Sequence, residues 1–348
     1  MSSHTHNIDS KGSFLWNLHY FRAFAIMNIV LIHVLFIPNE QDINLGLQIA
    51  LKLRDSIFDG STIYFVFISG FLFHRLNQKL NIKVFYKKKL VNIVVPYVVI
   101  STIFFTALYF TGEMRLLSFN DLPYLLISGK VQFHLWYIPF IVLIFIISPV
   151  FLKINSKTYT YLLPLLLVIP MSGTRTGVDN TPWQFMFFVP IFLVGMISSM
   201  YYLKTIQVTK KFSLLMIILV LISTVLLYFL DFDGRIMNVI SPRTGLIYVQ
   251  KIIISFLLIS YMPKVRNKKL LFFERMANYS FAIYFTHIFL HGVLLRFFFK
   301  PFLYTIDSSM FSLLSVFTYG LLLLILNLIL IWIAKKILGK YSRYIIAT

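Results

Sequence analysis

The sequence contains no cysteine and is poor in charged residues, acidic ones above all. Without cysteine, no thiol nucleophile, thiolate metal site or disulfide can form. Charged residues make up 13% of the chain, and only 12 of its residues are Asp or Glu. About a quarter of the residues of a soluble domain are charged. The absence of cysteine excludes a disulfide-stabilised scaffold. The low content of charged residues excludes an ordinary soluble enzyme and a disordered chain.

Apolar residues are what the chain has in excess. They make up 59% of its 348 residues, and the mean hydropathy is +0.82. One soluble core cannot hide so much apolar surface, because such cores stop growing at about 250–300 residues. We therefore predict an all-α, polytopic membrane helix bundle of about ten transmembrane helices. The expected spans lie near 18–38, 57–76, 90–111, 132–152, 158–172, 183–202, 212–230, 244–262, 278–299 and 310–334, and the longest connections are 38–56 and 77–89.

The net charge of +20 is unevenly spread over these connections. Lys and Arg concentrate in alternate ones, and Asp and Glu concentrate in the others. The positive-inside rule then predicts that the basic connections and both termini are cytoplasmic. The charge thus orients the protein in a membrane, and no nucleic-acid partner is expected. We divide the chain into a polar tail (1–13), a membrane domain (14–336) that begins with a retained anchor helix, and a basic tail (337–348).

The first expected span carries Arg22 near one end and His33 deeper within it. They are 11 residues apart, which is three helical turns plus about 20°, so they share one face about 16 Å apart along the axis. Ionisable residues within a membrane usually mark a pathway or a site. The alternative is that Arg22 reaches the lipid headgroups and that His33 is a hydrogen-bonded packing residue.

Five segments carry a resemblance to a known family. They are 18–33 with its Arg22/His33 pair, 64–72 with Ser69-Gly70, 85–90 followed by Pro96-Tyr97, 134–137 (His-Leu-Trp-Tyr), and 279–287 ending in His287. Over residues 16–335 the chain resembles the acyltransferase-3 family of integral membrane O-acyltransferases. It departs from many members at Ile63, where they have Asp (the nearest acid here is Asp59), and in a lysine triplet where they use Arg. The absence of that Asp, together with the short stand-alone length, looks more like the exopolysaccharide-modifying, intercellular-adhesin-like branch.

The resemblance implies transfer of an acyl group, often acetyl, from cytoplasmic acyl-CoA to a hydroxyl of an extracytoplasmic cell-surface glycan. The location it implies is the bacterial plasma membrane. His33 and Arg22 are the expected catalytic residues. His33 is expected to be the general base, although an acyl-histidine intermediate stays open. Residues expected to bind acyl-CoA are Arg22, Arg75, Lys87, Lys88, Lys89, Ser69 and Gly70; the last two could instead serve helix packing.

Four further residues are expected on the acceptor side: His134, Trp136, Tyr137 and His287. Interfacial anchoring and helix-to-helix hydrogen bonding are the alternatives for them. Arg243, in an expected outer loop, could contact an anionic glycan or simply be solvated. We expect no metal site and no tightly bound cofactor, because acyl-CoA is a substrate.

Three rival functions stay open. The first is a transporter or flippase for polysaccharide or lipid-linked sugar, the second a non-catalytic scaffold, and the third an acyltransferase for lipid or amino-acid acceptors. Expected partners are membrane lipid, acyl-CoA and a glycan or its precursor. A second copy of the chain or a glycan-synthesis complex is also open, and the sequence does not distinguish acetyl from succinyl as the transferred group.

Overall fold

The computed structural model describes residues 14–34, 45–77, 80–112, 114, 117–172, 182–229, 242–295 and 309–348. Every regular element among them is a helix, which confirms the all-α prediction. The main helices are α1 (Trp16–Ile32), α2 (Leu45–Phe58), α3 (Thr62–Leu76), α4 (Ile82–Lys89), α5 (Val95–Phe110), α6 (Leu122–Ser128), α7 (Tyr137–Phe151), α8 (Ser156–Ser172), α9 (Pro182–Met200), α10 (Tyr202–Lys211), α11 (Ser213–Phe229), α12 (Pro242–Tyr261), α13 (Leu271–Asn278), α14 (Ser280–Leu294), α16 (Ser309–Leu338) and α17 (Ser342–Ile345).

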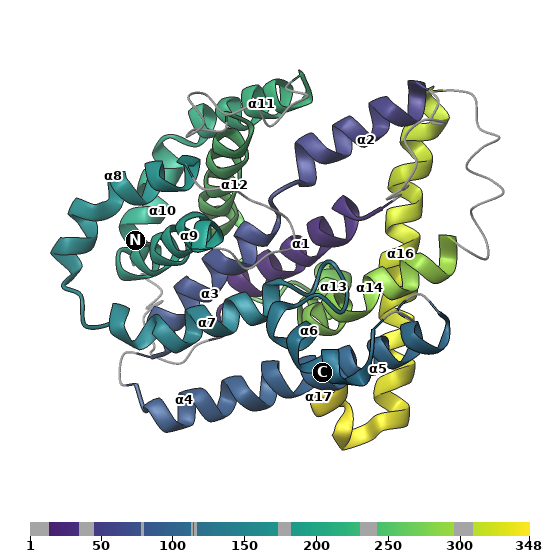
Figure 1. Cartoon of the computed structure of the whole chain (residues 1–348). Coiled ribbons are helices and arrows are strands. Elements are labelled where there is room, and N and C mark those ends of the chain that lie inside the picture. The colour runs from purple at the N-terminus through teal and green to yellow at the C-terminus, as the bar shows by residue number, and fades with distance from the viewer. Residues whose placement is uncertain are drawn as a thin grey trace.

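Helix α1 runs through the middle of the bundle (Figure 1). It packs against α2, α3, α12, α13, α14 and α16. Its sequence is apolar nearly all round, as is typical of a helix enclosed by others, and Phe21, Ala25 and Ile26 are fully buried. The helix that carries Arg22 and His33 is therefore an interior element of the fold.

Helices α3 and α9 form the closest pair, and two glycines allow it. A Cβ atom on Gly70 would lie 1.9 Å from the carbonyl oxygen of Phe192, and one on Gly195 would lie 2.2 Å from that of Phe67. Small residues that let two backbones touch are typical of helix contacts within membranes. Gly70 thus serves packing against α9.

Among the residues that the structure describes, four helical segments are long and apolar enough to cross a bilayer: Leu45–Leu76, Ile82–Phe110, Pro242–Tyr261 and Val316–Ile345. There are five if α9 and α10, which meet at 98°, count as one. Other expected spans form apolar helices of 15 to 17 residues, α7, α8, α11 and α14 among them. The chain is thus a multi-pass membrane protein, while the count of ten and the orientation of the termini stay predictions.

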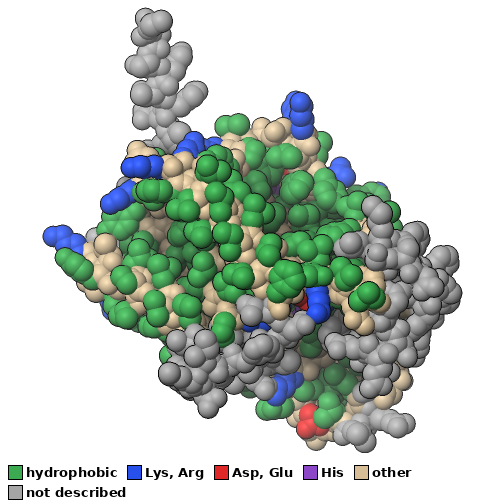
Figure 2. Space-filling model, turned by 90° about the horizontal axis from the view of Figure 1, so that it is seen from above, with side chains coloured by type: hydrophobic (Ala, Val, Ile, Leu, Met, Phe, Trp, Pro, Cys, Tyr) green, Lys and Arg blue, Asp and Glu red, His purple; other side chains and the backbone are tan. Residues whose placement is uncertain are grey.

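The surface fits that environment. Figure 2 shows one face on which hydrophobic side chains cover most of the described surface, with Lys and Arg mainly towards its edges. Helix α11 exposes Leu214 by 72%, Leu221 by 61% and Phe229 by 74%. Apolar surface on this scale is typical of contact with lipid.

The two longest predicted connections were wrong in part, because both contain helix. Residues 45–58 form α2, and 82–89 form α4, which continues through a π-helical turn (Leu90–Val94) into α5. Arg54, assigned to a loop from its charge, is only 8% exposed. Its guanidinium donates to the carbonyl of Val34 at 2.5 Å and pairs with Asp55 at 2.7 Å. The charge of Arg54, which the sequence alone places in water, is thus satisfied by the carbonyl of Val34 just beyond α1 and by the carboxylate of Asp55.

Candidate active site

Three histidines from distant parts of the chain meet beside the end of α1. His33 follows the last residue of α1, His134 lies in the turn before α7, and His287 lies in α14. The ring centroids of His33 and His287 are 5.4 Å apart, and those of His134 and His287 are 5.0 Å apart. The structure therefore brings together all three histidines that the sequence placed in the site.

The hydrogen bonds of His287 define its tautomer. Its Nδ1 atom lies 3.0 Å from the carbonyl oxygen of Ile283 and 2.8 Å from that of Tyr284. Carbonyls only accept, so Nδ1 donates, and in the neutral ring Nε2 carries the lone pair. This Nε2 atom is buried without a hydrogen-bond partner among the described residues. It is an available proton acceptor inside the cluster.

His134 is the least satisfied of the three. It is 3% exposed, and neither ring nitrogen has a hydrogen-bond partner within the described part of the chain. Buried polar atoms in native proteins are nearly always paired. His134 therefore brings two buried nitrogens without a hydrogen-bond partner among the described residues to the edge of the histidine cluster, beside the ring of His287.

A cavity of about 300 Å³ opens beside this cluster, and we call it the histidine cavity. Its lining includes His33, His134, Trp136, Tyr137 and Tyr284 together with Asp59 and Arg243. Arg243 Nη2 lies 3.8 Å from Asp59 Oδ2, and both side chains are partly exposed. Arg243, which the sequence placed in a loop, thus faces the same space as His33.

Side chains of α12 hold the turn that bears Asp59 by hydrogen bonds to the end of α2. Lys251 is fully buried, and its Nζ atom donates to the carbonyl of Ile57 at 2.5 Å and to Gln250 Oε1 at 2.6 Å. Gln250 Nε2 donates to the carbonyl of Ser56 at 3.1 Å. A cation at the carboxyl end of α2 complements the helix dipole, so Lys251 and Gln250 position one wall of the histidine cavity.

A second cavity, of about 270 Å³, lies along α1 at its other end, and we call it the arginine cavity. Arg22, Ser69, Lys89 and Tyr137 are among its lining residues. The Lys89 ammonium lies 3.6 Å from the centroid of the Phe145 ring, which partly offsets the loss of its hydration. Two cationic groups therefore face one partly apolar chamber.

Other residues predicted to bind the donor do not line the arginine cavity. Lys87 and Lys88 are exposed on α4, and Gly70 contacts α9. Arg75 lies on α3 beside His74, whose Nδ1 atom is 3.0 Å from the hydroxyl of Ser199 on α9. On the other side, Trp136 lines the histidine cavity and packs on Phe188 with ring centroids 5.7 Å apart.

A glycine folds the His134 turn back onto the bundle. Gly129 ends α6 with a φ of +75°, which residues with a Cβ atom rarely adopt. A Cβ atom there would also lie 2.5 Å from the Cα of Trp136. The close approach of these two backbones directs the turn that carries His134 towards α14.

The sequence-based reasoning missed Tyr284 and His291. The Tyr284 hydroxyl donates to the carbonyl of His134, and His291 Nδ1 lies 2.8 Å from the Tyr319 hydroxyl. Tyr284, His287 and His291 are three and four residues apart, so one face of α14 carries all three. That spacing was visible in the sequence and could have identified the face.

The fold and the two cavities define a class of protein: a multi-pass helical membrane protein with a cationic chamber and a histidine chamber along one central helix. The family comparison makes the class specific. A family model described as an acyltransferase domain, acyltransferase-3, matches residues 15–336, so the chain belongs to the acyltransferase-3 family and is a membrane acyltransferase. Comparison with curated proteins and with solved structures gives no match.

Proposed function

We propose that this protein transfers an acyl group from cytoplasmic acyl-CoA to a hydroxyl of an extracytoplasmic cell-surface glycan, in the plasma membrane of a bacterium. The observation that carries the proposal is the pair of cavities along α1. Arg22 lines one, His33 lines the other, and Tyr137 belongs to both. We choose an exopolysaccharide-type glycan as the acceptor because Ile63 stands where many family members have an acidic residue.

The arginine cavity is the proposed donor site. Acyl-CoA is anionic at its nucleotide end, and Arg22 and Lys89 supply charge-assisted donors within the chamber. The exposed Lys87 and Lys88 raise the positive potential on the approach to it, and Arg75 adds to that charge from α3. The distance of about 16 Å from Arg22 to His33 is of the order that an extended phosphopantetheine arm covers.

The histidine cavity is the proposed reaction site. His33 takes the proton of the acceptor hydroxyl while that oxygen attacks the thioester carbonyl carbon. A C–O bond forms, the C–S bond breaks, and the CoA thiolate leaves and receives the proton from His33. His287 Nε2 and the unpaired nitrogens of His134 are placed to hold the acceptor hydroxyl or the developing oxyanion.

The direct test is His33→Ala in the purified protein, given radiolabelled acetyl-CoA and a crude cell-surface glycan. Loss of a general base costs about 10²–10⁴-fold in rate, so we expect both release of CoA and label in the glycan to fall at least a hundredfold. The matched control is His19→Ala, a histidine of the same helix that packs on Phe14 and Trp16 and should leave the rate unchanged.

Near-wild-type transfer by the His33→Ala protein would overturn the assignment. A wild-type protein that neither binds nor cleaves acetyl-CoA, yet moves glycan across vesicle membranes, would instead identify a carrier.

A further inference from the structure

A third, small cavity shares lining residues with the other two. Its volume is about 10 Å³, and it is lined by Phe65, Tyr137, Ile138, Ser280, Phe281 and Tyr284. Phe65 and Phe281 also line the arginine cavity, Tyr284 also lines the histidine cavity, and Tyr137 lines all three. This small cavity therefore borders both the arginine cavity and the histidine cavity.

A cavity of about 10–15 Å³ holds a single water molecule. The small cavity is therefore of the size of one water molecule or one methyl group. A buried water needs two to four polar partners, and the surface that faces this space is apolar. The occupant that fits both its size and its chemistry is a methyl group.

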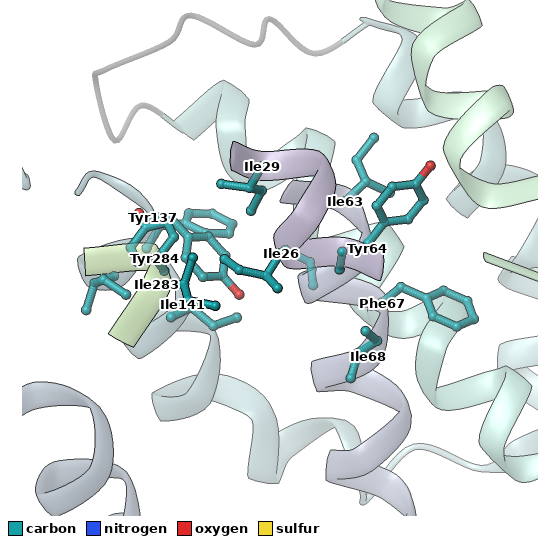
Figure 3. Close-up of a cluster of buried hydrophobic side chains, with 14 of the residues drawn as sticks. Ile26, Ile29, Ile63, Tyr64, Phe67, Ile68, Tyr137, Ile141, Ile283 and Tyr284 are labelled. Atoms are coloured by element: carbon teal, nitrogen blue, oxygen red, sulfur yellow. The ribbon is translucent and has the colours of Figure 1, made fainter. Parts of the chain in front are cut away.

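The walls of the small cavity are fixed by packing. Tyr137 and Tyr284 lie side by side (Figure 3), with ring centroids 5.8 Å apart. Tyr137 is 6% exposed, Tyr284 is 7% exposed and Ile138 is fully buried. The hydroxyl of Tyr284 is held by the carbonyl of His134. Because a close-packed interior resists added volume, these side chains cannot retreat cheaply from a longer chain.

We propose that the small cavity is the acyl-group pocket, and that Phe65, Tyr137 and Phe281 restrict the transferred group to acetyl. This inference rests on the proposed function. The methyl group occupies the small cavity, the CoA sulfur stays on the side of the arginine cavity, and the carbonyl carbon is open to attack from the histidine cavity. A succinyl chain is excluded twice, because it is too long and because its carboxylate would be buried without a partner.

The test is a series of donors of increasing length: acetyl-, propionyl-, butyryl- and succinyl-CoA, each measured by CoA release and by transfer to crude cell-surface glycan. One methylene in an apolar pocket changes kcat/KM by about 10–200-fold. We therefore expect the wild-type protein to prefer acetyl-CoA over propionyl-CoA at least tenfold, and to leave butyryl- and succinyl-CoA almost unused.

Two variants enlarge the small cavity from different helices, Phe65→Ala on α3 and Phe281→Ala on α14. In each we expect the ratio of acetyl to butyryl transfer to fall by about tenfold or more. Tyr137→Phe is the control for size, because it keeps the ring and should keep the ratio whatever its effect on rate.

The outcomes separate the two proposals. If the wild-type protein releases CoA from none of the donors, the proposed function fails. If it transfers acetyl and butyryl groups equally well, or if folded Phe65→Ala and Phe281→Ala proteins keep the wild-type ratio, the proposed function stands and the acyl pocket is wrong. The donor series on the wild-type protein needs no variant, so a variant that fails to fold leaves the inference testable.

Discussion

His287 shows how its own helix prepares a side chain for chemistry. The carbonyls of Ile283 and Tyr284, one turn earlier on α14, hold its Nδ1 proton. The basic Nε2 atom is thus the acceptor of a ring that packs against His33 and His134. We predict that His287→Ala lowers kcat for acyl transfer at least tenfold, because a positioned proton acceptor is lost. The KM for acyl-CoA should change little, because His287 does not line the arginine cavity.

The matched control is His291→Ala, one turn further along the same helix. His291 bonds to Tyr319, whereas the ring of His287 lies 5.4 Å from that of His33 and 5.0 Å from that of His134. Removal of His291 should therefore leave kcat unchanged. Equal losses in the two variants would assign both histidines to helix packing.

Arg22 should act on the donor more than on the chemical step. It faces the arginine cavity together with Lys89, and a hydrogen bond to a charged group contributes about 1.5–3 kcal/mol. We predict that Arg22→Ala raises the KM for acetyl-CoA by about tenfold or more, with a smaller fall in kcat. Steady-state kinetics measures the changes in KM and kcat separately. The control is Arg275→Ala, which removes an exposed cation on α13. A fall in kcat alone would place Arg22 outside the donor site.

At this scale the sequence predicts much of the candidate site. The spacing of Arg22 and His33 placed them on one face of a helix, and both line cavities that meet at Tyr137. The approach of Asp59 and Arg243 could not be predicted, because contacts between residues so far apart in sequence depend on how whole helices pack. Of the three lysines at 87–89, Lys89 lines the arginine cavity together with Arg22. Composition and charge do not predict which lysine of the three does so.

Among the helices, the α3 and α9 pair holds the donor side together. Because Gly70 and Gly195 meet the backbone of the partner helix, a larger side chain must push the two helices apart. We predict that Gly70→Leu and Gly195→Leu each cost about 1–3 kcal/mol or more of stability, seen as a lower Tm of the detergent-solubilised protein. Gly292→Leu on α14 is the control, since no atom of the described residues lies within 4 Å of a Cβ atom there. An equal loss in all three proteins would mean that leucine itself, and not the close helix contact, is responsible.

The ends of the helices were harder to predict than their existence. The apolar runs located α3, α5, α7, α9, α12, α14 and α16, because burial in lipid or in the bundle needs continuous apolar residues. Helix α2 was missed because Lys52, Arg54 and Asp55 resemble a solvated loop. Arg54 is instead satisfied by the carbonyl of Val34 and by Asp55, which are partners that only the tertiary fold supplies.

For the whole molecule, the proposed reaction depends on which face of the membrane each substrate reaches. We propose that the arginine cavity takes the donor from the basic side, which is predicted to be cytoplasmic, and that the histidine cavity takes the acceptor from the other side. CoA does not cross lipid, since its phosphates are strongly hydrated anions. Sealed vesicles of opposite orientation, retaining their own surface glycan, therefore report which face receives the donor.

The most direct measurement is label transfer from radiolabelled acetyl-CoA added outside such vesicles, with vesicles that contain the His33→Ala protein as the blank. We predict that inside-out vesicles label their glycan, and that sealed right-side-out vesicles do so only after detergent opens them. Equal labelling by both kinds of intact vesicle, or labelling that persists with the His33→Ala protein, would contradict the account.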